Sequence, residues 1–262
     1  MKKNILGKTI LFFVPVFLFF ALETHATGRS FYELIVYHIK DTAQENATDF
    51  YLQNAFIPAM HRLKIEKVGV FKPIANDTAQ DKTLYVFFAV NNLDDLLKIP
   101  AKLNADEAYK AAGKNFIDAT FDKPCYARME TIVLYAFPMA PQQTMPNLKA
   151  PLTERVYELR SYESATEKIH ENKVDMFNAG GEIPLFKRLN YNAVFYAQVI
   201  AGSRMPNLMY MTTFENIADR EAHWKTFGED AEWKTLSAKP EYQHNVSKID
   251  VILMHPTAYS DF

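Results

Sequence analysis

The sequence predicts an α+β fold made of two consecutive units, and two observations lead to that prediction. First, motifs recur in the same order: Tyr32-Glu33-Leu34-x-x-Tyr37 returns as Tyr157-Glu158-Leu159-x-x-Tyr162, and Ile57-Pro58 returns as Ile183-Pro184. Second, the stretch between these repeats, 138–155, carries four prolines, which cannot continue a helix or a central strand. A duplicated unit with a proline-rich linker explains both observations.

In the first unit, the chain from 31 to 39 is rich in aromatic and β-branched residues and is therefore expected to form a strand. Apolar residues at helical spacing predict a helix over 42–63, which Pro58 should kink. The expected remaining elements are strands over 67–72 and 84–90, a helical stretch over 93–121 broken near Pro100, and a closing strand over 128–137.

The second unit repeats this order. We expect strands over 156–162, 192–200, 208–214 and 246–255, and helices over 166–189 and 218–237, with Gly180-Gly181 interrupting the first helix. The order βαββαβ is that of the ferredoxin-like unit, with helices on one face of an antiparallel sheet. Because the other face is left bare, two tandem units can pack those faces together.

The N-terminus is typical of a secretory signal. Lys2, Lys3 and Lys8 precede an uncharged apolar run, and Thr24 and Ala26 place small residues before the expected cleavage point. The predicted organisation is a signal peptide over 1–26, a first domain over 27–137, the linker over 138–155 and a second domain over 156–262. The protein is then exported, to the periplasm or beyond, and attached to a membrane only if the signal is retained.

Composition excludes several classes of function. The net charge of −2 offers no basic excess for a phosphate backbone, so no nucleic-acid partner is expected. Cys125 is the only cysteine and cannot form an internal disulfide or a cysteine-based zinc site. With 48% hydrophobic residues, the chain can rely on its core for stability.

Charged and aromatic residues recur at matching positions of the first strand in each unit. Alternation places Glu33 and Tyr37 on one face, and Glu158, Arg160 and Tyr162 on the same face of the second unit. We expect this face to lie between the two sheets, with the opposite face, which carries Leu34, Val36 and Leu159, packed on the helices. Arg160 is the available partner for Glu158, either as a structural ion pair, which is the favoured interpretation, or as part of a polar cavity.

The short hairpin over 202–207 contributes two further candidates, Arg204 and Asn207. Polar residues on a short loop often bind a ligand or a neighbouring subunit, and the interface role is slightly preferred here.

No motif indicates a cofactor or a metal. Glu167-x-x-His170 and Glu241-x-x-His244 have the spacing of carboxylate-bridged iron sites, but the expected fold lacks the facing helices such sites require. The charged neighbours of His170 indicate a histidine on the surface. Glycine-rich phosphate loops and G-x-S-x-G motifs are absent from the sequence.

The chain resembles the NIPSNAP family, within the dimeric α/β-barrel superfamily. The resemblance rests on the second-unit strand motif from Tyr157 to Tyr162, on Arg204-Met205-Pro206-Asn207, on Glu232-Trp233-Lys234, and on the ending His255-Pro256-Thr257-Ala258-Tyr259-Ser260. It implies a barrel-type fold in tandem or dimeric form, and with it a homo-oligomer, but no reaction. We therefore expect a module that binds a small molecule or a protein. The alternative is a cofactor-independent monooxygenase or isomerase with a cavity around Glu158, Arg160 and Tyr162.

Overall fold

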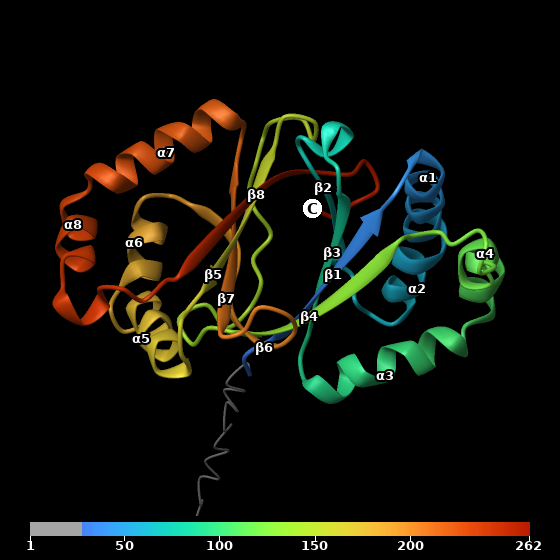
Figure 1. Cartoon of the computed structure of the whole chain (residues 1–262), viewed down its shortest axis with the longest axis horizontal. Coiled ribbons are helices and arrows are strands. Elements are labelled where there is room, and N and C mark those ends of the chain that lie inside the picture. The colour runs from blue at the N-terminus through green and yellow to red at the C-terminus, as the bar shows by residue number, and fades with distance from the viewer. Residues whose placement is uncertain (1–27) are drawn as a thin grey trace, which may run out of the picture.

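The computed structural model describes residues 28–262, so the predicted signal peptide lies outside the described residues. These residues form an α+β fold in which eight strands close a single barrel, with all neighbouring strands antiparallel (Figure 1). Around the barrel the order is β1-β3-β2-β8-β5-β7-β6-β4. The strands are β1 (Phe31–Ile39), β2 (Gly69–Pro73), β3 (Lys82–Val90), β4 (Arg128–Ala136), β5 (Val156–Glu163), β6 (Asn192–Ala201), β7 (Asn207–Phe214) and β8 (Lys248–Pro256).

Each half of the chain supplies four adjacent strands in the same relative order. The first half runs β4-β1-β3-β2 and the second runs β8-β5-β7-β6. Two short seams join the halves: residues 71–73 pair with 254–256, and residues 133–136 pair with 197–201. One chain thus provides every strand that closes this barrel.

Helices cover the outside of the barrel on two sides, those of the first half on one side and those of the second half on the other (Figure 1). They are α1 (Thr42–Tyr51), α2 (Ile57–Arg62), α3 (Leu93–Asn104), α4 (Glu107–Ile117), α5 (Glu167–Phe177), α6 (Glu182–Arg188), α7 (Ile217–Glu229) and α8 (Ala231–Ser237). Within residues 28–262, no helix combines the length and the apolar character needed to cross a membrane.

Two predicted helix breaks have different outcomes. Gly181 adopts a φ of +100° between α5 and α6, so the break at the glycine pair is confirmed. Pro100 lies inside α3, so the predicted break there is wrong. The helix ends instead at Ala105–Asp106, where the Asp106 side chain accepts a hydrogen bond from the Tyr109 amide and begins α4. The bend expected at Pro58 takes the form of a π-helical turn, Leu52–Phe56, just before it.

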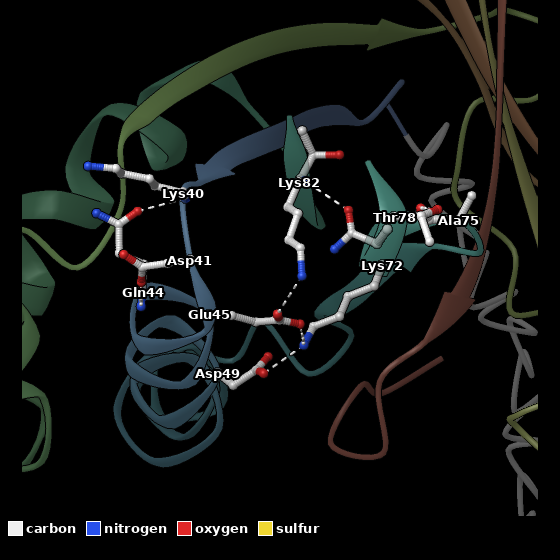
Figure 2. Close-up of polar contacts among 11 residues, drawn as sticks. Lys40, Asp41, Gln44, Glu45, Asp49, Lys72, Ala75, Thr78 and Lys82 are labelled. Carbon is white, nitrogen blue, oxygen red and sulfur yellow. Dashed lines mark hydrogen bonds and ion pairs between the residues drawn. The ribbon is translucent and has the colours of Figure 1, made fainter. Parts of the chain in front are cut away.

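A charged cluster ties α1 to the sheet of the first half. Lys72 on β2 lies 2.7 Å from both Glu45 and Asp49 on α1, and Lys82 approaches Glu45 from β3 (Figure 2). The Tyr259 hydroxyl donates to Asp49 and so brings the segment after β8 to the same place. The residues of this cluster satisfy one another, and we assign it a structural role.

Three apolar cores show which way each strand faces. Leu34, Val36 and Leu159 belong to the core inside the barrel. Ile35 and Tyr37 pack against the helices of the first half, and Tyr162 packs against those of the second half. The faces predicted from the sequence are therefore reversed: the face that carries Glu33 and Glu158 is covered by helices, and the opposite face lines the barrel.

Aromatic side chains fill the barrel toward the end where β1 and β5 begin. Phe87 stacks on Phe195 with ring centroids 4.7 Å apart, and Phe71 lies 4.8 Å from Tyr157. Phe262, from the segment after β8, contacts Phe71, Phe87 and Tyr157 and is itself buried. We call these residues, together with Tyr32, the aromatic plug.

Candidate functional site: the open mouth of the barrel

The opposite end of the barrel, where β1 and β5 finish, opens into a cavity of about 610 Å³. Cavities of a few hundred to a thousand Å³ are the usual size of small-molecule sites. Its inner wall is mainly apolar, with a few hydroxyl groups, and consists of Leu34, Val36, Thr83, Tyr85, Ile132, Leu159, Ser161, Met209, Val251 and Ile252. Its rim carries His38, Asp81, Glu130, Ser203, Arg204 and Asp250. We call this cavity and its rim the mouth.

The mouth exists because the seams between the halves stop short of this end. β4 pairs with β6 only from Val133 onward, and β8 pairs with β2 only from Met254 onward. The first residues of β4 and β8 therefore hydrogen-bond to one neighbouring strand each and leave the barrel wall open. Glu130 and Asp250 occupy equivalent registers on these two strands, opposite Val36 and Ser161 respectively.

One side of the rim is built by the first half around His38. Its Nδ1 lies 2.9 Å from Asp81 Oδ2, and its Nε2 lies 3.1 Å from Glu130 Oε1. Burial alone would lower the pKa of His38, but the hydrogen bonds and charges of the two carboxylates outweigh burial and raise it. Ser203, from the β6–β7 hairpin, donates to the other oxygen of Glu130 at 3.2 Å.

The other side of the rim is an ion-pair network of the second half. Arg204 contacts Asp250, and its Nη1 lies 3.3 Å from Glu163 Oε1. Lys248 approaches the same two carboxylates, at 3.6 Å from Asp250 and 3.9 Å from Glu163. The structure thus places Arg204, predicted as a ligand or interface residue, at the mouth.

Asn207, the other hairpin candidate, has a different environment. It is fully buried at the start of β7 and exchanges two hydrogen bonds with Ser161, at 2.9 and 3.1 Å. Asn207 therefore holds the base of the hairpin against β5, and Arg204 projects from a hairpin fixed in this way.

Glu158 lies outside the cavity, under α7. Its carboxylate is fully buried and receives hydrogen bonds from Arg160 Nε at 2.5 Å, Arg220 Nε at 2.6 Å and Trp224 Nε1 at 2.8 Å. The Arg160 guanidinium also stacks 3.8 Å above the Trp224 ring. The predicted Glu158–Arg160 pair is confirmed. Its partners on α7 were missed, because nothing in the sequence brings β5 and α7 together.

Two further buried contacts extend from this group. Arg160 Nη1 donates to the Tyr162 hydroxyl at 3.1 Å, which in turn lies 2.9 Å from the Tyr210 hydroxyl. Separately, Lys173 on α5 and Glu182 on α6 form a buried ion pair at 2.9 Å. These groups hydrogen-bond to one another, and Tyr162, Tyr210, Lys173 and Glu182 are all buried.

In the first half the matching position is occupied by Glu33, and its environment differs. Counting from the helix caps Asn92 and Asn216, the counterparts of Arg220 and Trp224 are Leu96 and Pro100, and Ile35 replaces Arg160. Within residues 28–262, no hydrogen bond or ion pair reaches the Glu33 carboxylate, and burial raises its pKa to about 7. Tyr37, the second candidate of this strand, packs edge-on against Tyr126 and Phe116 in the helix-covered core.

The prediction that His170 lies on the surface is wrong. Only 6% of the residue is exposed, and its Nδ1 has no hydrogen-bond partner among the described residues. Burial lowers its pKa. Among residues 28–262 there is no group of three or more His, Cys, Asp or Glu side chains placed to hold a metal ion.

Several solved structures share this fold over most of the chain. A protein from Lactobacillus acidophilus, described as a candidate monooxygenase, shares 10% identity over 87% of this chain and 94% of its own, with a TM-score of 0.55. A Fusobacterium nucleatum protein with the same description shares 7% identity over 87% of this chain and 93% of its own, with a TM-score of 0.54. An anthrone oxidase-like protein shares 9% identity over 87% of this chain and 92% of its own, with a TM-score of 0.52. At these identities the likeness concerns the fold alone.

The sequence comparison is more specific for the second half. Residues 157–261 match the NIPSNAP family model. No curated protein matches the sequence.

Proposed function

We propose that this protein binds a small molecule with an apolar body in the mouth of its barrel, without performing chemistry on it. The observation that carries the proposal is the cavity itself, which joins an apolar inner wall to a charged rim. Such a combination buries the body of a ligand and fixes its polar end. Export to the periplasm or beyond, as the N-terminal sequence suggests, would make it an extracytoplasmic binding protein.

We also propose that the two halves are tandem copies of one ferredoxin-like unit, with the first half a diverged NIPSNAP-type copy. This proposal is supported by the strand order that the two halves share and by the motifs that recur in the sequence. The proposed duplication explains why a single chain can close the barrel. If this protein forms a homo-oligomer, the second chain is therefore not needed to close the barrel.

A cofactor-independent monooxygenase or isomerase centred on Glu158, Arg160 and Tyr162 is less well supported. A catalytic carboxylate must reach its substrate, and Glu158 is fully buried with its oxygens bonded to Arg160, Arg220 and Trp224. The similar structures described as monooxygenases share the fold, which hosts unrelated functions.

A substitution that fills the cavity with a larger side chain tests this proposal. Ile252 lines the mouth, whereas Ile249 on the same strand is half-exposed and faces away from it. We expect the neutral dye Nile red to become fluorescent on binding the wild-type protein and the Ile249→Trp control. Ile252→Trp should weaken this binding by about tenfold or more, because the added ring occupies the cavity. Equal dye binding by both variants would show that the dye, and by implication the ligand, does not use the mouth.

A further inference from the structure

The charged groups at the mouth fall into two sets with different balances. Arg204 and Lys248 face Glu163 and Asp250, so the set contributed by the second half carries two charges of each sign. The first-half set contains Asp81 and Glu130 with only His38 between them. With a neutral imidazole this first-half set carries two negative charges, and with an imidazolium it still carries one.

The uncompensated carboxylates are also the accessible ones. About 65% of the Asp81 side chain and 45% of the Glu130 side chain are exposed at the rim, against 21% for Glu163 and 30% for Asp250. An anionic group entering the mouth would have to displace Asp250 or Glu163 from Arg204. A cationic group can approach Asp81 and Glu130 without breaking any ion pair between permanently charged groups.

Below its charged rim, the mouth is lined mainly by apolar side chains. Leu34, Val36, Leu159 and Met209 lie below the rim on the inner wall, and the aromatic plug fills the barrel beyond them. A ligand therefore meets carboxylates at the opening and hydrocarbon underneath. Each part of the cavity selects a different part of the molecule.

From this arrangement we propose that the mouth takes a cationic amphiphile: an amine or quaternary ammonium head held by Asp81 and Glu130, with an apolar tail in the barrel. The inference rests on the proposed binding function and specifies its ligand class. Asp81, from the loop before β3, and Glu130, on β4, act as specificity-determining residues. Arg204 and Lys248, neutralised by their own carboxylates, shape the far side of the rim.

Isothermal titration calorimetry with three ligands of equal chain length tests this, using decylammonium, decanol and decanoate at pH 8 and low salt. An alkyl ammonium is fully charged at this pH, as a lysine side chain is. We expect decylammonium to bind at least about tenfold more tightly than decanoate, with decanol between them, and the preference to shrink in high salt. Glu130→Gln and Asp81→Asn should each reduce decylammonium affinity by about threefold or more while leaving decanol binding unchanged.

The matched control is Glu229→Gln, an exposed glutamate at the end of α7 and outside the mouth. It should leave all three affinities as they are. Decanol and decanoate binding as tightly as decylammonium would overturn the cationic assignment and leave the binding cavity standing. If none of the three ligands bound, the proposed binding function would fail together with it. Thermal melts of the variants check that the exposed substitutions leave the fold intact.

Discussion

Replacing Glu33 by glutamine should stabilise the protein at alkaline pH. Glu33 lies on the helix-covered face of β1 without a hydrogen-bond or ion-pair partner among the described residues, and burial raises its pKa to about 7. Above that pH the folded chain holds a poorly solvated carboxylate, whereas the unfolded chain exposes the same group to water. A glutamine side chain has nearly the same shape as glutamate and removes the charge.

The magnitude follows from the pKa difference between the folded and unfolded chains. Between an ordinary value of 4.5 and about 7, at roughly 1.4 kcal/mol per pKa unit, ionised Glu33 costs at most about 3.5 kcal/mol in the folded state. Because the folded chain binds its proton more tightly, the cost is absent below pH 4.5, grows as the pH rises and is complete above about 7. At roughly 2–4 °C per kcal/mol for a chain of this size, the ceiling is a melting-temperature gain of roughly 14 °C at pH 8.

Thermal unfolding followed by circular dichroism at pH 5 and pH 8 measures this effect. The Glu33→Gln melting temperature should exceed that of the wild type at pH 8, and the difference should narrow at pH 5. The equivalent Glu158→Gln variant is the control with the opposite sign, because it weakens the hydrogen bonds that Arg160, Arg220 and Trp224 donate to the carboxylate and should lower stability at both pH values. A Glu33→Gln protein that melts at or below the wild-type temperature at pH 8 would refute the reasoning.

Three further predictions concern other buried groups. Arg160→Ala should cost about 3–5 kcal/mol of unfolding free energy in denaturant titrations, because it removes a partner from the fully buried Glu158; a loss under about 1 kcal/mol would mean that Arg220 and Trp224 together satisfy the carboxylate. Phe262→Ala should cost about 3–5 kcal/mol in the same titrations by opening a hole in the aromatic plug, and wild-type stability would show that its ring contributes no packing. For His170, burial lowers the pKa, so the folded chain favours the neutral ring and loses stability as the pH falls below 6.5; melts of His170→Phe should fall less between pH 7 and pH 5 than wild-type melts, and parallel curves would contradict this.

The alternation of side chains predicted the strands well and their orientation badly. In a sheet with one wet face, apolar residues mark the buried side, but here helices cover one face and the barrel interior lies against the other. Both Leu34 and Ile35 are therefore buried, and alternation alone cannot tell which of them faces the barrel. Because Glu158 lies among aromatic residues, it was predicted to face the space between the two sheets. It faces the helices instead, where Arg220 and Trp224 of α7 donate hydrogen bonds to it.

Helix residues were misjudged for a related reason. His170 and Lys173 lie among charged neighbours, yet both are buried, and Lys173 pairs with Glu182 across the glycine break. Only the angle between α5 and α6 brings these two side chains together. The mouth could not be predicted from the sequence either, because it depends on where the pairing of β4 with β6 and of β2 with β8 stops. Arg204 was singled out from its place on a short hairpin, and its partners Glu163 and Asp250 came from the fold.

Supplying all eight strands from one chain has a consequence for selectivity. A barrel closed by two identical chains repeats each side chain about its symmetry axis, so a ligand meets the same groups in two equivalent orientations. In this mouth, equivalent positions of the two halves carry different side chains. His38 on β1 corresponds to Glu163 on β5, and Val36 on β1 corresponds to Ser161 on β5. For the ligand proposed above, the two sides are therefore chemically distinct, and one orientation of its polar end is expected to be preferred. Substitution on one side can retune that orientation without altering the other side.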